Sequence, residues 1–317
     1  MRRSNSTALK AIVAMGVVAF LFLFAASFGL KSALRPDEAE RVRLKRSASP
    51  FDADAAKALA DALAAAGSRV PGQPGEAAAR ALLLSQPLRT REIAVGELRH
   101  VIAEVPGRKS GAILLLAHFT AFSGAPEGYV GANDGAAASA CLAALARSIG
   151  RDNFGRNLLF AWLGGRADTP EEIAQFATGL LDALRAGPNP PDIDAALYVD
   201  AVGDCYLHLA DDGGAPAWMR ETLAEAANTL GLRAHFGALA RAQSAVSAGF
   251  STRGVPSLAL IDDTYGGSLV EHGKQWHTVL DTPDRVCRDS LKAVGDVLYH
   301  ALPALDARLD ALGSGTS

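Results

Sequence analysis

Short apolar segments that alternate with helical patterns constrain the fold of this chain more than any other feature of its sequence. Residues 112–117 (AILLLA), 157–163 (NLLFAWL) and 195–200 (AALYVD) are apolar at almost every position. A strand has this composition when both faces of its sheet are covered, as in parallel sheets packed between helices. Stretches with Ala and Leu at helical spacing separate the three runs. This order predicts an α/β fold with a mainly parallel, mixed sheet between layers of helices.

The other predicted elements fit the same fold. Residues 92–105 have the pattern of one or two strands, and residues 256–261 form a fourth short apolar run. Ligands of such sheets bind where the strands end and the loops begin. Polar residues just after the apolar runs are therefore the first candidates for a site. The predicted helices cover residues 52–66, 76–85, 135–149, 170–185, 217–230 and 290–312.

The N-terminal segment has the pattern of a membrane anchor. Residues 11–30 carry no charge, and as a helix they would span about 30 Å, the thickness of the hydrocarbon core. The run is longer than that of a usual signal peptide, so we predict an uncleaved single-pass transmembrane helix. The basic N-terminus (1–10) precedes it, and a polar, basic linker (31–50) follows it. Residues 51–317 are predicted to form one domain.

Composition excludes several classes of protein. Hydrophobic residues make up 49% of the 317 residues, which is too many for a disordered chain. The formal net charge is −3, so the chain lacks the basic excess of a general nucleic-acid binder. The cysteines allow at most one disulfide and therefore do not indicate the compartment. They are Cys141, Cys205 and Cys287.

Four potential metal ligands follow the apolar runs. His118 comes directly after the first run, and Asp200 ends the third. Asp134 lies in a Gly/Asn turn that opens a helix, and His277 follows the fourth run after a loop. Each of them alone has a structural explanation; Asp134, for example, suits a helix N-cap. Two imidazoles and two carboxylates at one rim of a sheet are nevertheless a suitable ligand set for zinc.

Several segments together resemble metallopeptidase family twenty-eight, which contains zinc-dependent aminopeptidases and glutaminyl cyclases. The resemblance begins near Phe51, continues almost to the C-terminus, and implies a three-layer αβα sandwich of the zinc-exopeptidase type. It also implies that His118, Asp134 and Asp200 bind one zinc ion. Asp134 would bridge to a second ion held by His277. The segments that carry the resemblance are 67–83, 100–119, 131–147, 195–204, 253–261 and 276–286.

The chain departs from this family at the catalytic acids. Active relatives carry a Glu-Glu pair after the strand that matches residues 157–163, but here those positions are Arg166 and Ala167. A guanidinium cannot bind a cation or accept a proton at neutral pH, and a methyl group offers no donor atom. Glu171 and Glu172 follow, with Asp168 just before them. The two glutamates are the predicted catalytic acids if the loop brings them into the site, and Asp168 could enter it in the same way. Their alternative is structural, because acidic residues in a first helical turn stabilise the helix dipole.

A second departure lies beside the first ligand. Relatives usually have His-x-Asp where this chain has His118-Phe119-Thr120. The Asp of that pattern orients the ligating histidine, and such groups affect metal affinity. Its replacement by Thr120 leaves the orientation of His118 to another group.

The resemblance implies a membrane-anchored zinc-dependent exopeptidase of the aminopeptidase type, with one or two zinc ions, acting on peptide or protein N-termini. The first alternative is a catalytically degenerate binding or assembly protein on the same fold. The second is a glutaminyl-peptide cyclotransferase, because a Trp precedes the final His in those enzymes, as Trp276 does here. We predict an extracytoplasmic domain, although the basic residues after the anchor favour the cytoplasm. The oligomeric state stays open.

Overall fold

The computed structural model describes residues 49–121, 124–149, 154–165, 169–241, 243–262, 264–266 and 273–314. The predicted anchor and nearly all of the predicted linker lie outside these residues. Within them, no helix is both long enough and apolar enough to cross a bilayer. The boundaries predicted for the anchor, the linker and the domain therefore stay predictions.

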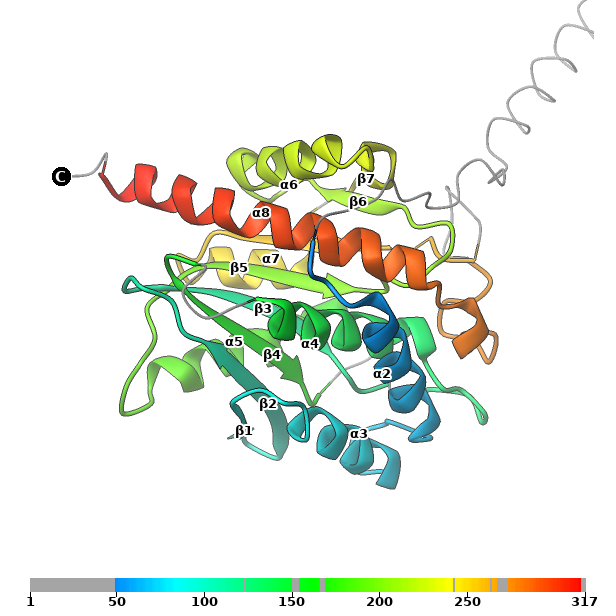
Figure 1. Ribbon diagram of the computed structural model, residues 1–317. Coiled ribbons are helices and arrows are strands. Elements are labelled where there is room, and N and C mark those ends of the chain that lie inside the picture. Colours follow the sequence, from blue (N-terminus) through cyan, green and yellow to red (C-terminus); the bar gives the residue numbers. More distant parts are fainter. Residues whose placement is uncertain are drawn as a thin grey trace, which may run out of the picture.

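A six-stranded mixed sheet forms the centre of the molecule (Figure 1). Its strand order is β1-β2-β4-β3-β5-β8. Strand β2 is antiparallel to both of its neighbours, and β4, β3, β5 and β8 are mutually parallel. The prediction of an α/β fold with a mainly parallel, mixed sheet is confirmed. The strands are β1 (Thr90–Val95), β2 (Leu98–Val105), β3 (Ala112–His118), β4 (Asn157–Leu163), β5 (Ile193–Asp200) and β8 (Ser257–Ile261).

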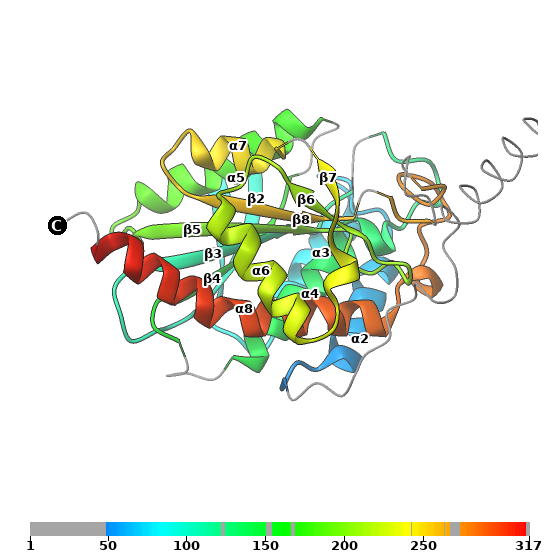
Figure 2. The same ribbon diagram turned by 90° about the horizontal axis from the view of Figure 1, so that it is seen from above.

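Helices cover both faces of the sheet, and Figure 2, seen from above, shows the sheet edge-on between the two helix layers. One face packs against α2, α4, α6 and α8, and the other against α5 and α7. All seven residues of β3 are buried because the strand lies between both helix layers. The helices are α2 (Ala53–Ala65), α3 (Pro74–Leu84), α4 (Ala138–Ser148), α5 (Pro170–Arg185), α6 (Ala217–Thr229), α7 (Ala245–Ser251) and α8 (Arg288–Ser314).

The sequence did not predict a second, two-stranded sheet. It pairs β6 (Leu209–Asp212) with β7 (Phe236–Arg241) in parallel, beside α6. Strand β6 has only four residues, and two of them are aspartates, which strands seldom contain. Four residues are too few to show the alternation of apolar and polar side chains by which a strand is recognised in a sequence.

The helix predicted from residue 135 begins later than expected. Residues 132–137 form an irregular turn, and the regular helix α4 starts at Ala138. Asp134 has φ −74° and ψ 100°, and Gly135 has φ 87°, so neither residue is helical. This break turns the Asp134 side chain away from a capping position and toward the carboxyl ends of the central strands.

Candidate metal centre

Two of the predicted ligands are the last residues of neighbouring strands. His118 ends β3 and Asp200 ends β5. The two strands are parallel and paired, so their carboxyl ends meet at one edge of the sheet. The Nε2 atom of His118 lies 3.0 Å from Oδ1 of Asp200. The predicted convergence of these two residues follows from the strand order alone.

Asp134 completes a cluster of three donor groups. Its Oδ1 atom lies 3.2 Å from Nε2 of His118. One donor atom from each of His118, Asp134 and Asp200 lies within 4.8 Å of the others, and all three residues are buried. Ligands of a tetrahedral zinc ion stand about 2.0–2.2 Å from the metal, and hence roughly 3.3 Å from one another. The observed separations suit one such ion.

The orientation of His118 supports the same interpretation. Its Nδ1 atom lies 2.8 Å from the main-chain oxygen of Thr120, which can only accept a hydrogen bond. Nδ1 therefore carries the proton, and the lone pair of a neutral ring lies on Nε2, which faces two carboxylates. Three electron-rich groups buried around one point are unfavourable without a cation between them. The donor set thus fits a bound divalent metal ion.

The main-chain carbonyl of Thr120 orients His118, although the Thr120 side chain lacks the carboxylate that relatives use for this purpose. Relatives use an Asp side chain two residues after the ligating histidine, whereas here the main-chain carbonyl of the same residue orients His118. The Thr120 hydroxyl is buried and has no hydrogen-bond partner among the described residues. The side chain itself is therefore dispensable for the orientation of the ligand.

This arrangement makes a conservative substitution informative. Thr120→Val keeps the shape of the side chain and the carbonyl, and removes only an unpaired hydroxyl. We expect the free energy of unfolding to change by less than about 1 kcal/mol, and zinc affinity to stay within roughly threefold of wild type. Isothermal titration with zinc checks this, and a loss of a hundredfold would show that the hydroxyl has a role.

Gly135 allows the close approach of the loop to His118. Its φ of +87° is in the region that favours glycine, and a Cβ atom there would lie 2.9 Å from Cε1 and 3.0 Å from Nδ1 of the imidazole. Any side chain at this position would displace the ring or the loop. The turn therefore requires glycine on both conformational and steric grounds.

We expect Gly135→Ala to weaken zinc binding by roughly 10- to 100-fold, the range found when groups behind metal ligands are changed. Direct titration of the purified variant measures this. Gly254→Ala is the matched control, because Gly254 also has a positive φ (+75°) but a Cβ there would meet nothing within 4 Å. Equal zinc affinity of the two variants would contradict the steric argument.

Asp281 holds the loop that carries Asp134. Its carboxylate accepts hydrogen bonds from the main-chain N–H groups of Asn133 (2.7 Å) and Asp134 (3.0 Å). The pKa of Asp281 is raised to about 7, chiefly because the group is buried and in part because Asp134 is close. Asn133 joins the same loop to the end of β5, since its Oδ1 accepts the N–H of Gly203 at 2.6 Å. Neither Asp281 nor Asn133 was predicted from the sequence as part of the site.

Arg69 is a buried centre of hydrogen bonding below the ligands. Its side chain, 1% exposed, donates to the carbonyl oxygens of Phe119 (2.7 Å), Gly131 (2.7 Å) and Asp134 (3.1 Å), and also to those of Leu63 and Val130. The pKa of Arg69 is lowered, chiefly because the group is buried, and the nearby Tyr129, Asp134 and Asp281 offset part of this shift. One cation thus ties the residue after His118 to the loop of Asp134.

The fourth predicted ligand, His277, lies on the other side of Asp134. Its Nε2 atom is 3.6 Å from Oδ2 of Asp134, and it does not belong to the group of three. The ring stacks on Trp276, with ring centroids 3.7 Å apart and planes 13° apart. His277 has φ 56°, a conformation uncommon for residues other than glycine, which often marks a functional position.

The predicted catalytic acids occupy the first turn of α5, and both are exposed. Glu172 forms a capping box with Thr169, since its Oε2 accepts the Thr169 N–H at 3.1 Å. Neither Glu171 nor Glu172 belongs to the metal-ligand group found among the described residues. Arg166, Ala167 and Asp168 lie outside the described residues.

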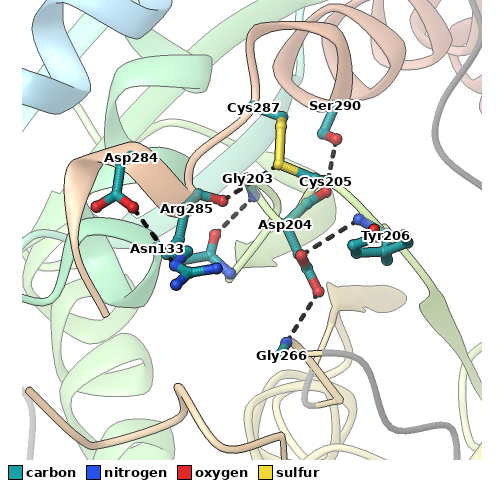
Figure 3. Close-up of a disulfide and its surroundings, with 10 residues drawn as sticks. All are labelled: Asn133, Gly203, Asp204, Cys205, Tyr206, Gly266, Asp284, Arg285, Cys287 and Ser290. Carbon is teal, nitrogen blue, oxygen red and sulfur yellow. Dashed lines mark hydrogen bonds and ion pairs between the residues drawn. A yellow bond between two sulfur atoms is a disulfide. The ribbon is translucent and has the colours of Figure 1, made fainter. Parts of the chain in front are cut away.

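A disulfide braces the segments next to the site (Figure 3). It joins Cys205, five residues after Asp200, to Cys287, across a sequence separation of 82 residues. The main chains beside it are also paired, since the Cys287 N–H donates to the Gly203 oxygen at 2.8 Å. The loop after β5 is therefore fixed to the segment that follows Asp281. Cys141 is buried and unpaired.

Several solved structures share this fold. A glutaminyl cyclase from an Acidobacteriales bacterium has a TM-score of 0.69 and 24% identity, over 84% of this chain and 98% of that one. A Zn-dependent exopeptidase from Parabacteroides distasonis has a TM-score of 0.66 and 22% identity, over 80% of this chain and 98% of that one. A leucine aminopeptidase precursor from Bacteroides thetaiotaomicron has a TM-score of 0.66 and 18% identity, over 82% of this chain and 98% of that one. At such identities the likeness concerns the fold.

No curated protein sequence matches the chain. Residues 100–302, in contrast, match the sequence profile of Peptidase family M28. This region is more than half of the chain and includes His118, Asp134, Asp200 and His277. Both the match and the placement of three of these side chains around one point agree with the resemblance found in the sequence. The chain belongs to peptidase family M28.

Proposed function

We propose that the protein is a zinc-dependent exopeptidase of the aminopeptidase type. One observation carries the proposal: His118, Asp134 and Asp200 present three buried donor atoms within 4.8 Å of one another. A scaffold without metal chemistry has no need of two buried carboxylates facing one imidazole, because burying such charges is costly. The substrates we propose are peptide or protein N-termini.

His118, Asp134 and Asp200 would hold the ion, and Asp281 and Arg69 would keep the loop of Asp134 in place. A zinc ion supplies a more acidic bound water and polarises a carbonyl group. Tyr198 orients Asp200, since its hydroxyl donates to Oδ2 at 3.0 Å. Glu171 is the better candidate for proton acceptor, because Glu172 is engaged in the helix cap.

The test is release of N-terminal residues from a panel of short peptides by the purified full-length protein. We expect turnover that stops with a zinc chelator, returns when zinc is added back, and is lost in His118→Ala. Glu171→Gln should lose most of the rate, whereas Glu172→Gln should keep it and lose only some stability. Turnover that is insensitive to the chelator, or unchanged in His118→Ala, would contradict the proposal.

The second candidate is a glutaminyl cyclase. The stacking of Trp276 on His277, next to a site with three ligands for one ion, favours it. Cyclisation requires no attacking water and so no acid pair at positions 166 and 167. Peptides with N-terminal glutamine would lose ammonia without any cleavage of a peptide bond. A zinc-loaded protein that does neither reaction would instead support the degenerate binding protein.

We also propose that the domain is anchored by residues 11–30 and lies outside the cytoplasm. The disulfide between Cys205 and Cys287 supports this location, because disulfides persist in oxidising compartments. Protease added to intact cells should degrade the domain if it is exported. Complete protection, with degradation only after lysis, would contradict export to the cell surface.

A further inference from the structure

The two oxygens of Asp134 have different partners. Oδ1 faces Nε2 of His118 at 3.2 Å, on the side of the three-residue cluster. Oδ2 lies 3.6 Å from Nε2 of His277 and accepts a hydrogen bond from the hydroxyl of Tyr129. In the two-ion arrangement implied by the resemblance, Asp134 bridges both metals, so the second ion would have to bind Oδ2.

Tyr129 is fixed where its hydroxyl meets this oxygen. The side chain is only 4% exposed, and the main-chain N–H donates to the Pro126 oxygen at 3.0 Å. Arg69 holds the carbonyl groups of the two following residues, Val130 and Gly131. The hydroxyl thus belongs to the same rigid loop as Asp134 and cannot leave without moving it.

The second position also lacks donors. Zinc sites in proteins usually have three or four protein ligands. Among the residues that the structure describes, no carboxylate, imidazole or thiol joins Asp134 and His277 in a group of three. In the sequence, Arg166 and Ala167 stand where relatives place the glutamate of this position. Among the described residues, the donors therefore suit one ion and leave only Asp134 and His277 for a second.

We propose that Tyr129 is a positioning residue whose hydroxyl takes the place of a second cation on Asp134, so that the centre binds one zinc ion per chain. A neutral O–H donor satisfies Oδ2 and holds the carboxylate with Oδ1 toward His118. His277 is then a neighbour of the centre and not a ligand. The inference rests on the proposed function only for the first ion.

Zinc titration of the full-length protein, followed by calorimetry and by elemental analysis after removal of free metal, tests this. We expect one ion per chain in the wild type, even with zinc in excess. Tyr129→Phe removes only the hydroxyl and exposes Oδ2, so a second, weaker binding step should appear. That step should vanish in the Tyr129→Phe/His277→Ala double variant, because Asp134 is then the one protein ligand left to the second ion.

Tyr198→Phe is the matched control. Tyr198 is also buried and also donates to a ligand carboxylate, but to Asp200 on the other side of the cluster. It should show a single binding step. Two ions in the wild type, or a single step in a folded Tyr129→Phe variant, would overturn the inference and leave the proposed function standing. One bound ion without turnover would support the inference and contradict the proposed function. A protein that binds no ion at all would overturn both the inference and the proposed function.

Discussion

Replacing Arg69 by methionine is expected to lower the free energy of unfolding by about 4 kcal/mol, because buried carbonyl groups lose a charged donor. Five carbonyl oxygens from three segments depend on this guanidinium. Two of the segments carry His118 and Asp134, so zinc binding should be lost together with stability. Urea denaturation gives the first quantity, and metal analysis gives the second.

The control is the same substitution at Arg253. Its guanidinium pairs with the half-exposed Asp182 at 3.0 Å. Exposed pairs contribute at most about 1 kcal/mol, so Arg253→Met should remain close to wild type in stability and in zinc content. If Arg69→Met were equally mild, the hydrogen bonds below the ligands would not be what holds the site together.

Removing the disulfide is the second change with a large expected effect. A disulfide that closes a loop of 82 residues lowers the conformational entropy of the unfolded chain. In the chain-entropy description this raises the free energy of unfolding by about 4 kcal/mol. The Cys205→Ser/Cys287→Ser variant should melt roughly 10 °C below the wild type, since each kcal/mol shifts the melting temperature by a few degrees in a domain of this size. Zinc affinity should fall as well, because the brace fixes the loop after Asp200.

Reducing agent provides the internal control. Cys205 and Cys287 are both partly exposed and accessible to a reductant. A reductant should lower the melting temperature of the wild type to that of the double variant, and should leave the double variant unchanged. Thermal unfolding followed by circular dichroism measures both. A wild type that melts at the same temperature with and without reductant would show that the bond adds no stability.

The sequence predicted the strands that place the ligands, because each is an apolar run of strand length. Once two parallel neighbours end in His118 and Asp200, their meeting at one edge follows from topology. Asp134 was a weaker prediction from sequence, since the same residue suits a helix cap. The structure separates the two roles by breaking the helix at Gly135.

The groups that hold the ligands were not predictable in the same way. Arginine is usually exposed, so nothing local marks Arg69 as buried. The carbonyl that orients His118 belongs to the main chain, which every residue has. Tyr129 acts through a contact set by a loop without periodic pattern. For Asp281 the sequence does carry one signal, because the residue lies only four positions after the predicted ligand His277.

The pairing of cysteines had the same limit. Three cysteines allow three possible disulfides, and only the fold brings Cys205 and Cys287 to a Cα separation of 4.9 Å while leaving Cys141 in the core.

The catalytic role predicted for Glu171 and Glu172 has no contact in the described residues that supports it. Their positions in the first turn of α5 explain both residues structurally, so their part in catalysis stays a prediction.

The most direct test of the metal centre is anomalous diffraction at the zinc edge from crystals of the full-length protein grown with zinc. We expect one peak about 2.0–2.2 Å from Nε2 of His118 and from a carboxylate oxygen each of Asp134 and Asp200. A map without a peak between these three side chains, or with the ion held by other residues, would rule out this metal centre.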